Sequence, residues 1–194
     1  MTENQLSKEI VKGLFETAIE GDMSAVSCST AGDYPSIGFS QLEGDRADNL
    51  LACIDGGDRF IGRSYSDIEY SDELEELEEL ISSDQGVKAQ LSIVANDALD
   101  YVDAVMSVGV TNPRCIIYAG MWCPTSHWVV KNFIQRYSDC YDFNDLDDMC
   151  LAFYTDYARY ADCLDYEDGY QNRAHITYDY VSELDLGAYG VEPY

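Results

Sequence analysis

The segment EGDMSAVSCSTAGDYPSIGFSQLE, residues 20–43, carries the most information in this chain of 194 residues. It places Glu20 where an amphipathic helix should end, Asp33 in a Gly-rich turn, and Glu43 after a short β-like run. Enzymes that cut sugar chains need two carboxyl groups on opposite sides of one bond, one to protonate the leaving oxygen and one to activate water or attack the sugar. A helix end and a β-hairpin can form the two walls of such a cleft. The three carboxylates are therefore candidate catalytic residues.

The same segment resembles a known active-site region. A Glu that closes a helix, followed by a Gly-x-x-Gln turn such as Gly38–Gln41, is similar to the lysozyme superfamily, in particular its goose-type and lytic transglycosylase branch. Residues 19–52 look closer still to the lysozyme-like domains of phage endolysins and phage tail lysins of Gram-positive hosts. Residues 108–120, VGVTNPRCIIYAG, and 170–181, YQNRAHITYDYV, also resemble the C-terminal half of that family.

This resemblance implies a single lysozyme-like catalytic domain over residues 1–194. The fold class would be α+β, mainly helical, with a small β-hairpin beside the active-site cleft. A C-terminal helix carrying Tyr170 and Arg173 would close the back of the cleft. The chain departs from those relatives at Leu42-Glu43, where they often have Trp-His, and at Met23, where they often have an aromatic residue.

Glu20 is the leading candidate for the general acid. A general acid must hold its proton near neutral pH, which burial against apolar groups and nearby negative charge both favour. Asp33 and Glu43 are candidates for the second carboxylate. Asp after Gly is also common in plain turns, and Glu43 also fits as an acidic residue at the start of the next helix. Which of the two acts is left open.

Four further residues are candidates for substrate binding. Ser36 would hold a water by its hydroxyl, as small hydroxyl residues do in the phage lysozymes that the chain resembles. Gln41 would bind the backbone or a substrate N-acetyl group. Tyr118 and Trp122 are four residues apart and so share a helix face. They would stack on sugar rings or belong to the core, and the core is the stronger expectation for at least one Trp.

Charge and cysteine usage exclude several classes of function. The net charge is −26, from 37 acidic and 11 basic residues. That charge argues against nucleic acid backbones and anionic membranes as partners. Seven cysteines with no C-x-x-C pair and only two histidines argue against a zinc site. No metal or organic cofactor is expected, and the oligomeric state is left open.

Hydrophobic periodicity predicts a mainly helical chain with a hairpin or irregular β region at residues 24–41. Ser66 and Glu69 fit a capping box, and Asn112-Pro113 fits a helix start. Leu74, Leu77, Leu80 and Ile81 form the apolar stripe of an acidic helix. The predicted helices are residues 6–20, 46–54, 73–81, 87–108, 111–122, 125–137, 145–160 and 167–184.

The expected function is a peptidoglycan hydrolase, a muramidase that cleaves the β-1,4 bond between N-acetylmuramic acid and N-acetylglucosamine in glycan strands. One alternative is a lytic transglycosylase with a single catalytic Glu. Another is a non-enzymatic acidic virion part or DNA mimic. The N-terminus lacks a signal-peptide core, and no membrane insertion is expected. The resemblance implies synthesis in a host cytoplasm and action on the wall after holin release or within a virion.

Overall fold

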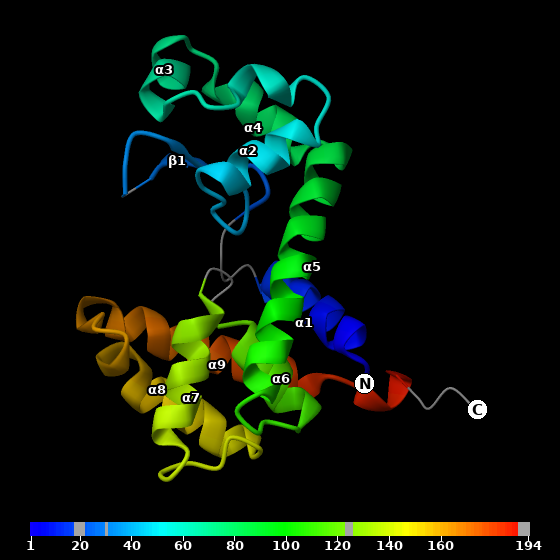
Figure 1. The fold of residues 1–194 in the computed structure, drawn as a ribbon, viewed down its shortest axis with the longest axis vertical. Helices are drawn as coiled ribbons and strands as arrows, with labels where there is room; N and C mark the ends of the chain where they lie inside the picture. Colours follow the sequence, from blue (N-terminus) through cyan, green and yellow to red (C-terminus); the bar gives the residue numbers. More distant parts are fainter. Residues whose placement is uncertain (18–21, 30, 123–125, 190–194) are drawn as a thin grey trace. The chain divides into compact units, whose positions relative to one another are not determined.

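The structure is a computed structural model, and its contacts divide the chain into two compact units (Figure 1). Unit 1 is Met1–Ile19 with Ala95–Tyr194, and unit 2 is Glu20–Val94. Unit 2 is therefore an insertion after the first helix of unit 1, and helix α5 (Asp84–Met106) contributes residues to both. The residues described are 1–17, 22–29, 31–122 and 126–189.

Unit 2 combines a small β-hairpin with short helices. Strands β1 (Val26–Cys28) and β2 (Pro35–Ile37) pair antiparallel, with Val26 opposite Ile37. This confirms the expected β region and, with the helices, the α+β class. The other elements are α2 (Asp45–Ala52), the 3-10 turn η1 (Gly57–Phe60), α3 (Tyr65–Tyr70), α4 (Leu74–Ser82) and the first part of α5.

The core of unit 2 forms where β2 and these helices turn their apolar side chains toward one another. On α4, Leu77 and Ile81 are fully buried, and Leu74 and Leu80 pack partly buried against them. The apolar stripe predicted for the acidic helix is thus confirmed, and its glutamates face outward. The remaining buried members are Ile37, Leu42, Ala47, Leu50, Leu51, Ile54, Phe60 and Ile68.

The capping box predicted at Ser66 is wrong. Helix α3 begins two residues earlier, and the side chain of Ser64 caps it by accepting a hydrogen bond from the Asp67 N–H at 3.1 Å. Ser66 lies within the first turn of α3 and donates from its N–H and its hydroxyl to the carboxylate of Asp33. The Ser66 side chain, which the local sequence pattern predicted as the cap, therefore bonds to a residue distant in sequence instead.

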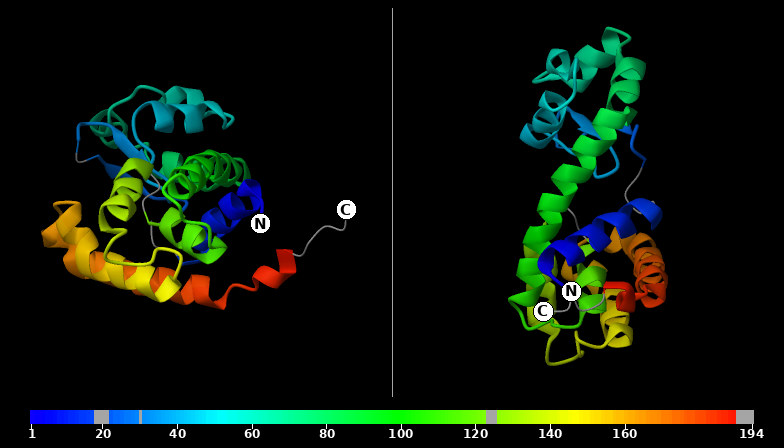
Figure 2. Two further views of the ribbon diagram at one scale, coloured as in Figure 1. Left: turned by 60° about the horizontal axis from the view of Figure 1, so that its bottom comes forward. Right: turned by 90° about the vertical axis from the view of Figure 1, so that its right-hand side faces the viewer.

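Unit 1 is helical. Its elements are α1 (Glu3–Thr17), the second part of α5, α6 (Pro113–Gly120), α7 (His127–Tyr137), α8 (Leu146–Tyr160), η2 (Leu164–Tyr166), α9 (Glu167–Glu183) and η3 (Leu186–Tyr189). Helices α8 and α9 lie side by side, as both views of Figure 2 show. Residues 115–120 of α6 are all buried, so α6 is the centre of the unit.

Local capping chemistry explains where two of these helices begin. The Asn112 side chain accepts from the Arg114 N–H at 3.0 Å, with Pro113 in the first turn of α6. Asp145 accepts from the N–H groups of Asp147 and Asp148, each at 3.0 Å, at the start of α8. The starts predicted at Asn112-Pro113 and Asp145 are confirmed.

Candidate functional site

The Gly38–Gln41 turn is a tight connection closed by backbone hydrogen bonds. Ile37 and Leu42 exchange two N–H to C=O bonds of 2.9 and 2.8 Å across it. Gly38 has a φ of +75° and Gln41 a φ of 48°, both in the left-handed region that few non-glycine residues adopt. The Gln41 side chain is exposed at the end of this turn. The turn therefore holds Gln41 outward in a defined backbone conformation.

One buried side chain of α5, Gln90, holds this turn in place by a hydrogen bond. Gln90 is 1% exposed, and its Oε1 accepts from the Phe39 N–H at 3.0 Å. Its Nε2 donates to the carbonyl oxygens of Met23 at 3.0 Å and Ile81 at 2.8 Å. A Cβ on Gly38 would overlap the Gln90 amide, so the glycine also makes room for it. Gln90 thus ties the turn, the segment after Glu20 and α4 together.

Asp33 is bound to helix α3. Its Oδ1 accepts from the Ser66 N–H at 3.0 Å and the Ser66 hydroxyl at 2.9 Å. These donors hold the pKa of the Asp33 carboxyl below its usual value. The group is an ionised anchor between the hairpin and α3, and a weaker proton acceptor than a free carboxylate. This supports the interpretation of Asp33 as a residue that stabilises the turn. Its catalytic role stays a prediction.

Ser36 and Glu43 lie on the hairpin and after it, respectively. Ser36 is on β2 and 4% exposed, and its Oγ has no hydrogen-bond partner among the described residues. Glu43 is half-buried directly before Gly44, the N-cap residue of α2. This position agrees with the alternative that Glu43 is an acidic residue at the start of the next helix. Glu20 lies outside the described residues.

Tyr118 and Trp122 belong to the core of unit 1. They are 0% and 1% exposed, and their rings lie 6.2 Å apart. The predicted shared helix face is wrong, because α6 ends at Gly120 and Trp122 follows its C-cap residue, Met121. Trp122 also packs on Phe153 at 4.4 Å and on Tyr157 at 4.7 Å. Burial raises the pKa of Tyr118 well above its usual value. Both rings are occupied by protein contacts, which supports the core alternative over sugar stacking.

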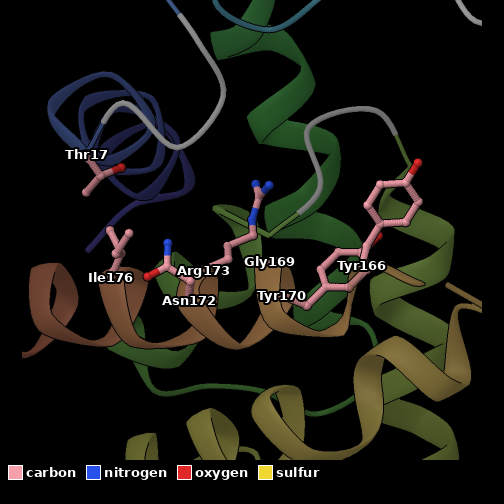
Figure 3. Close-up of a pocket in the computed structure, with 7 residues that line it drawn as sticks. All are labelled: Thr17, Tyr166, Gly169, Tyr170, Asn172, Arg173 and Ile176. Carbon is pink, nitrogen blue, oxygen red and sulfur yellow. The ribbon is translucent and has the colours of Figure 1, made fainter. Parts of the chain in front are cut away.

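A pocket of about 380 Å³ lies in unit 1 at the end of α1 (Figure 3). Thr17 contributes from α1, three residues before Glu20 in the sequence, and the side chains of Asn172, Arg173 and Ile176 project from α9. The pocket is lined by Thr17, Tyr166, Gly169, Tyr170, Asn172, Arg173 and Ile176.

The pocket combines aromatic faces with fixed polar groups. An Arg173 Nη donates to the Met121 carbonyl oxygen at 2.6 Å, so the guanidinium is held in place. Tyr170 stacks on the buried Trp122 at 6.0 Å with an interplanar angle of 17°. Two tyrosines, an amide and a guanidinium suit a ligand with apolar ring faces and many hydrogen-bonding groups.

Sequence reasoning found part of this arrangement. Tyr170 and Arg173 were expected on the C-terminal helix, and both line the pocket. Tyr166 and Asn172 were not predicted as site residues, although Asn172 lies within residues 170–181, which carry part of the resemblance. Gln90 was also missed, although an amide within an apolar helical stretch is a usable signal, because a buried amide must be hydrogen-bonded.

The chain is a mainly helical α+β protein with a two-stranded hairpin. Comparison of the chain with protein-family models, curated proteins and solved structures finds no match in any of the three. Among the described residues, no group of three or more His, Cys, Asp and Glu side chains is placed to hold a metal ion. In the same part of the chain, no helix has the length and apolar character to cross a membrane.

Proposed function

We propose that the chain is a peptidoglycan-cleaving glycosidase with a lysozyme-like fold and Glu20 as its general acid. The substrate is the glycan strand, cut at the β-1,4 bond between N-acetylmuramic acid and N-acetylglucosamine. Protonation of the leaving oxygen by a positioned carboxylic acid is the central step of such a cleavage.

The observation that supports this proposal most is the pocket at the end of α1. Thr17 lines it, and Glu20 follows Thr17 by three residues. Tyr166 and Tyr170 offer faces for sugar rings, and Asn172 offers both a donor and an acceptor for N-acetyl groups. The candidate general acid therefore follows, in the sequence, a helix whose last residue lines a pocket of suitable chemistry.

The Asp33 contacts favour the transglycosylase as a second candidate. A carboxylate that accepts two hydrogen bonds from Ser66 and has a lowered pKa is a poor base for water. A lytic transglycosylase needs no second carboxylate, because the substrate's own hydroxyl attacks. In this reaction Glu20 acts alone, first as acid and then as base.

Substitution of the acid is the first test. Glu20→Gln removes the proton donor while keeping the size of the side chain, so lysis of Gram-positive cell walls should fall about 10²–10⁴-fold. Glu16→Gln is the matched control, because Glu16 is also on α1 and its side chain is half exposed. Its lysis should stay near that of the unmodified chain. A folded Glu20→Gln variant with normal lysis would contradict the assignment.

Product analysis separates the candidates. Mass spectrometry of digested walls shows reducing muramic ends for a hydrolase and 1,6-anhydro-muramic ends for a transglycosylase. Asp33→Asn and Glu43→Gln are measured alongside. If one of them loses activity as Glu20→Gln does, that residue is the second carboxylate. If the unmodified chain releases no fragment from any wall, the non-enzymatic alternative replaces both.

A further inference from the structure

A second hollow in unit 1 lies apart from the pocket at the end of α1 and shares no residue with it. Its volume is about 490 Å³, and its walls come from α5 and α7. The lining residues are Asp100, Asp103, Ala104, Ser107, His127, Trp128 and Lys131.

Trp128 makes this hollow unusual. It is 60% exposed, whereas Trp122, the other Trp of the chain, is 1% exposed. The His127 ring lies 5.2 Å from the Trp128 ring, and His127 meets the buried Tyr101 edge-on at 5.8 Å. Lys131 places its Nζ 5.2 Å from the centre of the Trp128 ring. A large apolar ring is thus oriented by its neighbours and still open to solvent.

Polar groups of both signs surround this ring. Asp100 and Asp103 are exposed and three residues apart, so they share a face of α5. Within the described ranges, no ion pair joins Lys131 to either carboxylate. The hollow therefore presents hydrogen-bond acceptors at the aspartates and a donor at the lysine beside an aromatic face.

This combination selects one class of ligand. Two carboxylates beside one ammonium disfavour a phosphate or a nucleic acid backbone, which need basic surroundings. A purely apolar segment would leave the three charges desolvated and unpaired. Sugars suit the hollow because each ring has an apolar face for an indole and hydroxyls that both donate and accept.

We propose that the Trp128 hollow is a second glycan-binding site, separate from the pocket at the end of α1, that holds the N-acetylated hexosamine chain of a wall strand. This inference rests on the proposed function, because that function supplies the glycan. In this role Trp128 stacks on a sugar ring, while Asp100 and Asp103 accept hydrogen bonds from its hydroxyls.

The test uses the full chain in the Glu20→Gln form, so that the probe is not cut, and N-acetylglucosamine tetramer as the probe. Tryptophan fluorescence reports the site, because the two Trp residues differ in exposure. Adding Trp122→Phe should preserve an emission shift on binding, which reports Trp128. Adding Trp128→Phe should remove that part of the shift and leave only the contribution of Trp122, which stacks on Tyr170 of the other pocket. By calorimetry, Trp128→Ala should weaken tetramer binding about tenfold. Asp100→Asn with Asp103→Asn should weaken it about threefold, while Asp165→Asn, an exposed control, should not.

Failure of this inference is distinct from failure of the proposed function. Unchanged tetramer affinity in Trp128→Ala, with circular dichroism confirming the fold, overturns the second site and leaves the glycosidase proposal standing. Loss of affinity in Trp128→Ala, together with absence of wall cleavage by the unmodified chain, supports the second site and rejects only the glycosidase. A fluorescence shift confined to Trp122 locates binding at Tyr170 in the other pocket and also overturns the inference.

Discussion

Gln90 is a buried amide that satisfies backbone groups from three separate segments of unit 2. Gln90→Met keeps nearly the same shape but leaves the Phe39 N–H and two carbonyl oxygens without this partner. Each buried unsatisfied group costs about 1–3 kcal/mol, and partial relaxation should reduce the sum. We expect the free energy of unfolding of unit 2 to fall by about 2–4 kcal/mol in urea titrations.

Gln85→Met is the matched control for this prediction. Gln85 is on the same helix and also bonds to backbone, at Asp55 N and Cys53 O, but it is exposed. Water replaces those partners, so the loss should stay below about 1 kcal/mol. Equal losses for the two variants would show that burial does not decide the effect of Gln90.

Asp33 predicts a pH dependence of stability. Its pKa in the folded chain is lowered from 3.8 by the Ser66 donors, so its contribution is present above that value and is lost as the pH falls through the folded pKa. The urea midpoint of the unmodified chain should therefore exceed that of Asp33→Asn near neutral pH. The difference should shrink as the pH falls below 3.8. Asp55→Asn, an exposed control in unit 2, should show a smaller difference at every pH.

At the scale of elements, the packing of α1 on α6 depends on a close approach. A Cβ on Gly120 would overlap the end of the Ile10 side chain, which is 1% exposed and packed in the core. Gly120→Ala should therefore lower the free energy of unfolding by about 1–3 kcal/mol. Gly169, in α9, has open space around it, so Gly169→Ala should raise stability by about 0.5–1 kcal/mol. Thermal unfolding of both variants checks these two predictions. A change in stability of the same sign in both variants would contradict them.

For the whole molecule, the net charge of −26 opposes the compact state by self-repulsion. The Debye length falls from about 30 Å at 0.01 M salt to about 8 Å at 0.15 M. The melting temperature should rise by about 2–6 °C over that range, since 1 kcal/mol shifts it by about 2–4 °C in a chain of this size. Potassium and sodium chloride should act equally. A fall in melting temperature with salt would show that attractive ion pairs outweigh the repulsion.

The sequence by itself was sufficient where a structure depends on neighbours a few residues away. The helix starts at Asn112-Pro113 and Asp145, the apolar stripe of α4 and the hairpin region all follow from local capping and periodicity. The sequence predicts these features correctly because they depend on residues that are close together in the chain. The division into two compact units has no local signal, and the single catalytic domain over residues 1–194 stays a prediction beside it.

Tertiary structure decided which of several local options each side chain takes. Ser66 bonds to Asp33 rather than capping α3, because a carboxylate 33 residues away reaches it. Tyr118 and Trp122 are four residues apart, but α6 ends at Gly120, between them. Packing against Phe153 of α8 and Tyr170 of α9 is what buries Trp122. Local spacing fixes neither where a helix ends nor which distant parts of the chain cover a side chain. Exposure, and with it the availability of a side chain to a ligand, is therefore a property of the folded molecule.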